Sequence, residues 1–186
     1  MKLFLHALVI LLLASCDLKV GYRQNYFSVE EGKWDFKPAR FFQPSQRTLS
    51  WHTMFRDNCW YDADKFPAYD RLDLNKLYGI QSARIHQNSA MIAWRAEQDS
   101  VIAIYAYWYI NGKRDILRMG ETATSKFDWY RVRVKDNKYI FEFNYLPPVV
   151  IEGVDKNFWL NSYRIYPWFG GTQPAPHYME IIINEE

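Results

Sequence analysis

Hydrophobic and polar residues alternate over short runs along most of the chain after Arg47, and polar or glycine-containing turns separate the runs. This period of two residues is typical of β-strands, whose successive side chains point to opposite faces. No segment keeps a helical period. We expect only a single helical turn at 74–78 and an irregular, acidic loop at 57–73. The predicted strands are 48–55, 80–86, 90–96, 101–110, 114–119, 129–134, 139–144, 163–166 and 178–183.

Two tight turns support this interpretation. Asn111-Gly112 joins two predicted strands, and both residues tolerate the positive φ angles of a type I′ turn. Lys135-Asp136-Asn137-Lys138 forms a second connection of this kind. Many short strands with closely spaced turns predict an all-β fold of two antiparallel sheets.

The strand 101–110 is apolar on both faces. Trp108 and aliphatic residues share one face, which suits a core, and Tyr105, Tyr107 and Tyr109 share the other. If the tyrosine face is exposed, its rings could stack on sugars and hydrogen-bond through their hydroxyls. A central strand covered on both sides shows the same pattern, and this interpretation fits slightly better.

The neighbouring strand 90–96 places Met91, Ala93 and Arg95 on one face. If that face adjoins the tyrosines, the combined strip contains aromatic rings, small residues and an arginine. Such a composition suits a shallow groove for a glycan or a protein.

The segment 166–177 is the most unusual in the chain. Gly170-Gly171 permits backbone angles that other residues avoid, and Pro174 and Pro176 stiffen the second half of the segment. We expect a rigid loop with Trp168 at its start and His177 at its end. It could carry a binding site or act as a clasp that closes the sandwich.

The N-terminus predicts secretion and a lipid anchor. A basic Lys2, an apolar run and the string Leu13-Ala14-Ser15-Cys16 match a secretory signal over 1–15 that ends in a lipobox. We expect a diacylglyceryl thioether on Cys16 and attachment to a membrane surface through the acyl chains. Asp17 resembles the inner-membrane retention signal of enteric bacteria, but other phyla sort differently. We expect the cell envelope, with the outer membrane favoured over the inner.

The expected organisation is a signal at 1–15, a lipidated tether at 16–45 and a β-sandwich at 46–186. The tether is rich in aromatic residues, so part of it should pack on the domain, for example as an edge strand. The formal net charge of +2, without a basic patch, argues against nucleic acid as a partner. Cys59 has no partner for a disulfide, and we expect it to be buried.

Sequence motifs for catalysis are absent. A laminarinase-type Glu-x-Asp-x-x-Glu pattern, a Gly-x-Ser-x-Gly elbow and a phosphate-binding glycine loop are all missing. His52, His86 and His177 lack zinc spacing, and the acids of 57–73 fit solvated side chains better than calcium ligands. The sequence therefore leans away from an enzyme, and we expect neither a metal nor a cofactor.

Four segments resemble a group of small lipoproteins and phage-associated proteins of Bacteroidetes. The segments are Met54-Phe-Arg-Asp-Asn-Cys59, Ile85-His-Gln-Asn-Ser-Ala-Met-Ile-Ala-Trp-Arg95, 105–112 and Phe169-Gly-Gly-Thr-Gln-Pro-Ala-Pro-His177. The resemblance spans roughly 47–184. It implies a jelly-roll or concanavalin-like β-sandwich, and it implies neither an activity nor functional residues.

These observations leave three hypotheses. The first is a membrane-anchored, non-catalytic binding protein for glycans or cell-envelope material, with candidate contacts at Arg95, Tyr105, Tyr107, Tyr109, Trp168 and His177. The second is a structural or accessory lipoprotein that docks an envelope protein. The third, a glycoside hydrolase, requires two carboxylates at one cleft.

Overall fold

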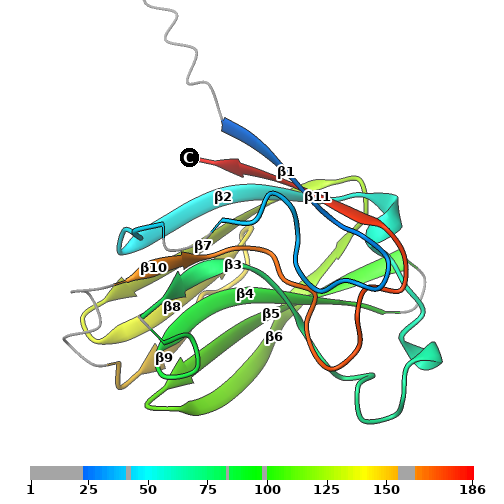
Figure 1. The fold of residues 1–186 in the computed structure, drawn as a ribbon. Helices are drawn as coiled ribbons and strands as arrows, with labels where there is room; N and C mark the ends of the chain where they lie inside the picture. The colour runs from blue at the N-terminus through cyan, green and yellow to red at the C-terminus, as the bar shows by residue number, and fades with distance from the viewer. Residues whose placement is uncertain (1–22, 41–42, 83, 98–99, 155–161) are drawn as a thin grey trace, which may run out of the picture.

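A computed structural model of the chain describes residues 23–40, 43–82, 84–97, 100–154 and 162–186. The described residues form two antiparallel sheets that pack face to face (Figure 1). The larger sheet has the order β1 (Arg23–Val29), β11 (Met179–Glu185), β2 (Thr48–Phe55), β7 (Phe127–Lys135), β8 (Lys138–Phe143) and β9 (Val149–Glu152). The smaller has the order β10 (Tyr163–Ile165), β3 (Asn75–Gln81), β4 (Ser89–Ala96), β5 (Val101–Ile110) and β6 (Lys113–Ala123).

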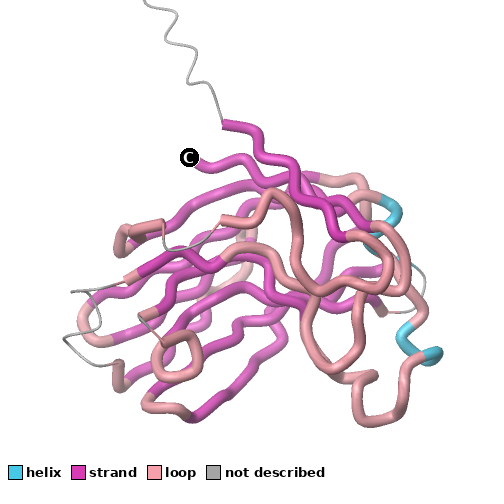
Figure 2. The backbone as a smooth tube through the Cα atoms, in the orientation of Figure 1, coloured by secondary structure: helices cyan, strands magenta, loops and turns pink. Residues whose placement is uncertain are grey.

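This architecture confirms the predicted all-β antiparallel sandwich of jelly-roll type. The first and last strands lie side by side at one margin of the larger sheet (Figure 1). Long irregular segments gather at one end of the sandwich, together with the short 3-10 helices η1 (Asp57–Cys59) and η2 (Ala63–Lys65) (Figure 2). Within the described part of the chain, no helix is long and apolar enough to cross a membrane.

Aromatic side chains build the core between the sheets. Trp51 on β2 stacks on Tyr130 of β7, with ring centroids 5.8 Å apart. The same indole meets the edge of Tyr78 from the opposite sheet at 5.1 Å. Such pairs add about 0.5–1.5 kcal/mol each beyond the burial of their area. Burial alternates along β2, as the sequence pattern predicts for a strand with one face on the core.

Both predicted turns have the expected geometry. Asn111 and Gly112 have φ angles of 51° and 80°, and Asp136 and Asn137 have 52° and 60°. Positive φ at both central residues is the signature of a type I′ turn. The turns therefore fix the register of the β5–β6 and β7–β8 hairpins, which pair from Ile110–Lys113 and Lys135–Lys138 outward.

The region around β3 corrects two predictions. The expected helical turn at 74–78 belongs to a strand that begins at Asn75, and the strand expected to reach residue 86 ends at Gln81. Asn75 is fixed by distant partners: its amide donates to the Tyr61 hydroxyl at 3.0 Å and accepts from Gly170 N at 2.8 Å. These tertiary hydrogen bonds outweigh the weak local preference for a helix.

Two further features were not expected. Strand β9, which directly follows Pro147-Pro148, pairs with β8 at the margin of the larger sheet. Asp70, expected to be solvated, is buried: it accepts hydrogen bonds from Thr172 Oγ1 at 2.6 Å and Gln173 Nε2 at 3.1 Å. A carboxylate can be buried when it is paired in this way, and here it ties the acidic loop to the C-terminal loop.

Candidate functional site

The smaller sheet has a second apolar layer on the face turned away from the core. Its buried members are Leu74, Met91, Ala93, Ala103, Tyr105, Tyr107 and Ile165. Because side chains alternate along a strand, this layer includes the set on β5 that the sequence singled out. Ile85 and Tyr109 pack at its margin.

The structure decides between the two interpretations of the tyrosine face of β5, and it agrees with the slightly favoured one, a covered strand. Tyr105 and Tyr107 are only 7 % and 6 % exposed. The covered-strand interpretation of β5 is therefore the right one: the two rings are buried in one apolar cluster with Leu74 and Ile165. Tyr109 is half-buried, and the ring of His86 from the β3–β4 connection lies 5.2 Å from its ring.

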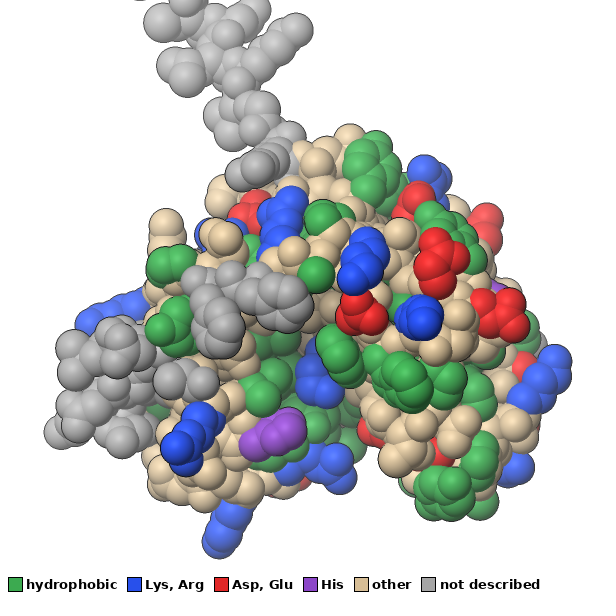
Figure 3. All heavy atoms as spheres, viewed as in Figure 1, with side chains coloured by type: hydrophobic (Ala, Val, Ile, Leu, Met, Phe, Trp, Pro, Cys, Tyr) green, Lys and Arg blue, Asp and Glu red, His purple; other side chains and the backbone are tan. Residues whose placement is uncertain are grey.

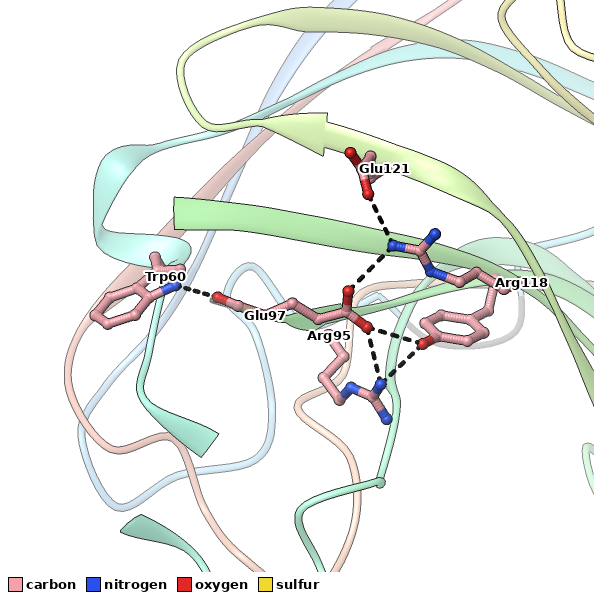
Figure 4. Close-up of polar contacts among 6 residues, drawn as sticks. Trp60, Arg95, Glu97, Arg118 and Glu121 are labelled. Carbon is pink, nitrogen blue, oxygen red and sulfur yellow. Dashed lines mark hydrogen bonds and ion pairs between the residues drawn. The ribbon is translucent and has the colours of Figure 1, made fainter. Parts of the chain in front are cut away.

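Arg95 and Tyr105 meet in an ion-pair network at one end of this face (Figure 4). Arg95 Nη2 donates to Glu97 Oε1 and to the Tyr105 hydroxyl oxygen, both at 2.9 Å. The Tyr105 hydroxyl donates to Glu97 Oε1 at 3.2 Å. Arg118 Nη2 contacts the other Glu97 oxygen at 3.1 Å and Glu121 at 2.9 Å. The charges of the four ionised groups balance, so the network stabilises the face without giving it a net charge.

Glu97 is held in its ionised form. Partial burial alone would raise the pKa of this carboxyl, but the hydrogen bond from Arg95 and the charge of Arg118 outweigh it and lower that pKa. Glu97 and Glu121 both contact Arg118, and they lie on a hollow of about 540 Å³. A glycosidase needs one carboxyl that stays protonated, and a lowered pKa opposes that role for Glu97.

Tyr107 lies near two cationic side chains. Lys76 Nζ is 6.0 Å from the centre of its ring, and the Arg114 side chain hydrogen-bonds to it. Its hydroxyl lies 3.3 Å from that of Tyr109. Burial raises the pKa of Tyr107 and lowers the pKa of Lys76, because each charged form loses hydration.

A cavity of about 470 Å³ opens on the β3 and β10 side of this face. Its walls combine aromatic and polar side chains, which include Lys76, Gln81, His86, Tyr166 and Trp168. Trp168 is 42 % exposed. Figure 3 looks onto this side of the molecule, where a histidine and basic side chains border a hollow with hydrophobic side chains inside it. The volume is within the range of small-ligand sites.

The C-terminal loop holds Trp168 in place by backbone pairing. Trp168 N donates to Lys76 O at 3.0 Å, and Lys76 N donates to Trp168 O at 2.9 Å. Gly170 lies so close to β3 that a Cβ atom there would be 2.1 Å from Leu74 O. Phe169 is buried against Tyr61. The loop therefore closes the sandwich as a clasp and presents Trp168 to the cavity as well.

His177 lies apart from these residues. Its Nε2 hydrogen-bonds to the carbonyl oxygen of Asn58 at 2.9 Å, beside η1. The structure thus brings together Arg95 with Tyr105, and Tyr107 with Tyr109, and it places Trp168 in the cavity. Cys16 lies outside the described residues.

Sequence reasoning missed the cavity residues Lys76, Gln81 and His86. They come from β3 and the turn after it, whose bounds were misplaced. His86 was the one signal in the sequence, where it was considered only as a zinc ligand. In the described ranges, no group of three or more His, Cys, Asp and Glu side chains is placed to hold a metal ion.

Comparison with known proteins shows the fold alone. No family model and no curated protein matches the chain. Among solved structures, an alginate lyase from Alteromonas sp. 272 is similar with a TM-score of 0.51 and 8 % identity, over 87 % of this chain and 84 % of that one. A polysaccharide lyase of family 18 is also similar with a TM-score of 0.51 and 8 % identity, over 90 % of this chain and 87 % of that one.

Proposed function

We propose that the chain binds a glycan in the cavity beside β3 and β10. The observation on which this rests is the exposed side chain of Trp168, whose backbone is paired with Lys76, in a cavity that also presents Gln81 and His86. An indole offers an apolar face on which a sugar ring stacks, and polar side chains around it bond to hydroxyl groups. Backbone pairing fixes the main chain of Trp168 before the ligand arrives, so less conformational freedom is lost on binding.

The fold supports this proposal. Two of the solved sandwiches that resemble the chain are an alginate lyase and a polysaccharide lyase, so each is named for action on a polysaccharide. Fold similarity at this identity does not transfer a site, and the proposal depends on the cavity of this chain.

The sequence-derived residues take different roles in this proposal. Trp168 contacts the sugar directly. Tyr109 lies at the margin of the buried layer, beside His86, which lines the cavity. The sheet is stabilised by the buried rings of Tyr105 and Tyr107 and by Arg95, which bonds to Tyr105. His177 has no role in this proposal.

Titration calorimetry against a panel of oligosaccharides tests the proposal. Trp168→Ala should weaken binding of any oligosaccharide that the wild type binds by about tenfold, which corresponds to about 1.4 kcal/mol of lost stacking. Tyr69→Ala, at an exposed tyrosine on the acidic loop, is the matched control and should bind as the wild type does. An unchanged affinity of Trp168→Ala would remove this cavity as the glycan site.

One observation favours the alternative of docking a protein of the cell envelope. Tyr145, Leu146 and Val150 are exposed large hydrophobic residues in and just before β9, at the margin of the larger sheet. Exposed apolar groups at a sheet margin suit contact with another protein. This alternative would be favoured if a stable protein copurifies with the wild type and is lost from Tyr145→Ala. The chain itself should then bind none of the sugars tested.

We also propose that Cys16 bears the lipid anchor that holds the protein at the envelope. The support is the small-residue cleavage string before the cysteine and the apolar run that precedes it. Bacteria that express the full chain should incorporate an alkyne-palmitate label. Cys16→Ser should lose the label, and Cys59→Ser should keep it. Labelling of Cys16→Ser would contradict the assignment. Separation of the inner and outer membranes would identify which of them holds the protein.

A further inference from the structure

The charges around the Trp168 cavity are unequal. Among the described residues, three basic side chains line it, Arg40, Lys76 and Arg164, and one acidic side chain, Asp35. Asp35 is already paired, because Lys37 Nζ lies 2.7 Å from its carboxylate. The hydrogen bond from Lys37 holds the pKa of Asp35 below its usual value, so the carboxylate is ionised and occupied. The cavity therefore has more positive than negative charge available to a ligand.

Arg164 has protein partners. Its guanidinium contacts the Glu185 carboxylate and donates to the Tyr78 hydroxyl at 3.1 Å. The Glu185 carboxylate neutralises Arg164. Arg40 and Lys76 are therefore the cations whose surroundings decide the charge of the cavity.

Arg40 contacts aromatic rings and an amide. Its guanidinium carbon lies 5.5 Å from the ring centre of Phe27 and 5.7 Å from that of Tyr166. It donates to Asn25 Oδ1 at 2.7 Å. Among the described residues no carboxylate lies within ion-pair distance of it. Cation–π contacts orient the guanidinium without cancelling its charge.

Lys76 is a partly buried ammonium without an ion pair to any described residue. Its Nζ lies over the Tyr107 ring. From further away, the charge of Asp73 raises the pKa of Lys76 and the charge of Arg114 lowers it. Removing a cation from water costs free energy unless an anion or hydrogen-bond acceptors replace the water. A negatively charged ligand group in the cavity would supply that replacement.

We propose that the cavity selects an acidic glycan, whose carboxylate or sulfate group pairs with Lys76 and Arg40 while a sugar ring stacks on Trp168. This inference rests on the proposed glycan binding and names the class of ligand. Carboxylate and sulfate share the chemistry that two cations without an ion pair to any described residue recognise, so the experiment has one arm for each.

The test uses the full-length protein in mild detergent and three probes of similar length: oligogalacturonate, dextran sulfate and neutral dextran. Titration calorimetry should show at least one acidic probe binding tenfold or more tightly than dextran. The affinity should fall several-fold between 50 and 300 mM NaCl, because salt screens ion pairs. The acidic probe that binds identifies the group as carboxylate or sulfate.

Lys76→Gln should weaken binding of the acidic probe about tenfold, because it removes one of the two cations that pair with the acidic group. Lys135→Gln, at an exposed lysine in the β7–β8 turn of the other sheet, is the matched control and should bind as the wild type does. Circular dichroism and the melting temperature show whether Lys76→Gln is folded. The salt dependence of the wild type tests the inference even if the variant does not fold.

The outcomes separate the two proposals. Dextran binding as tight as that of both acidic probes, or acidic binding that neither salt nor Lys76→Gln weakens, would overturn the choice of acidic ligands and leave glycan binding standing. If neither these probes nor a wider glycan panel binds, both proposals fail together.

Discussion

Individual side chains of β5 show why an apolar pattern does not by itself reveal a binding surface. Tyr105 and Tyr107 have the composition of a sugar-stacking strip, yet both are buried beside charged neighbours. Their hydroxyls are satisfied within the protein: Tyr105 bonds to Arg95 and Glu97, and Tyr107 to Tyr109 and Arg114. A buried tyrosine with bonded hydroxyl rigidifies a sheet face. Trp168, in contrast, is 42 % exposed and lines the cavity.

The ionisation of Glu97 gives a prediction about how the thermal stability of the protein depends on pH. Its pKa is lower in the folded chain than its usual value of 4.5, so its ionised form stabilises the fold at pH values above 4.5. That contribution is lost as the pH falls through the lowered pKa. Glu97→Gln should therefore melt about 2–4 °C below the wild type at pH 7, and the difference should shrink as the pH falls below 4.5.

Thermal melts by circular dichroism from pH 3 to pH 7 check this expectation. Glu31→Gln, at an exposed acid outside the network, is the control and should track the wild type throughout. If the difference in melting temperature between Glu97→Gln and the wild type stays constant over this range, the ionisation of Glu97 does not contribute to stability.

At the scale of elements, local signals succeeded where they were strong. Strand β2 begins and ends where its alternation predicts, and β5 coincides with the predicted apolar run 101–110. Both type I′ turns result from Asn, Asp and Gly at the required positions. The error at β3 has a non-local cause, since Asn75 is held by Tyr61 and Gly170. Strand β9 is four residues long, too short for its alternation to stand out.

The candidate site was less predictable than the fold. The pattern identified Arg95 and the tyrosines because one strand pair carries them, and the hairpins set their register. The cavity is formed by the N-terminal segment, β3 and the C-terminal loop, which are distant in sequence. Whether Lys76 and Arg40 meet an acid depends on which acids fold near them, and no local pattern contains that information.

Gly170 gives a prediction about the loop that holds Trp168. Alanine there would place its Cβ atom 2.1 Å from the backbone oxygen of Leu74, so the loop would have to move away from β3. Gly170→Ala should lower the free energy of unfolding by about 1–3 kcal/mol, as overpacking does, and should also weaken any oligosaccharide binding. Denaturant titration and calorimetry measure the two effects.

Gly153→Ala separates crowding from backbone strain. Gly153 has a φ of 87° and no atom within 4 Å of a Cβ position. Its substitution should cost about 1–2 kcal/mol through the left-handed conformation alone and leave oligosaccharide binding intact. Equal effects of both variants on binding would show that the position of the loop does not control the cavity.

On the scale of the whole molecule, one aromatic core joins the sheets and the loops at the end of the sandwich. Phe169 of the C-terminal loop, Tyr61 of the acidic loop and Trp94 of β4 lie in mutual ring contact. The clasp, the cavity wall and the core are thus continuous. We expect the described domain to unfold as one unit, because separating the loops from the sheets would expose buried aromatic area.

Cys59 can report this cooperativity. Its side chain is fully buried, its thiol donates to Glu180 O at 3.0 Å, and burial raises its pKa to about 12. Alkylation requires an accessible thiolate, so native protein should be inert at pH 8. In the Cys16→Ser variant, where Cys59 is the sole thiol, iodoacetamide labelling should appear with guanidinium at the same midpoint as the loss of circular dichroism. Labelling at a distinctly lower guanidinium concentration would show that the loop end, where η1 meets β11, opens before the sandwich, and would contradict a single unfolding unit.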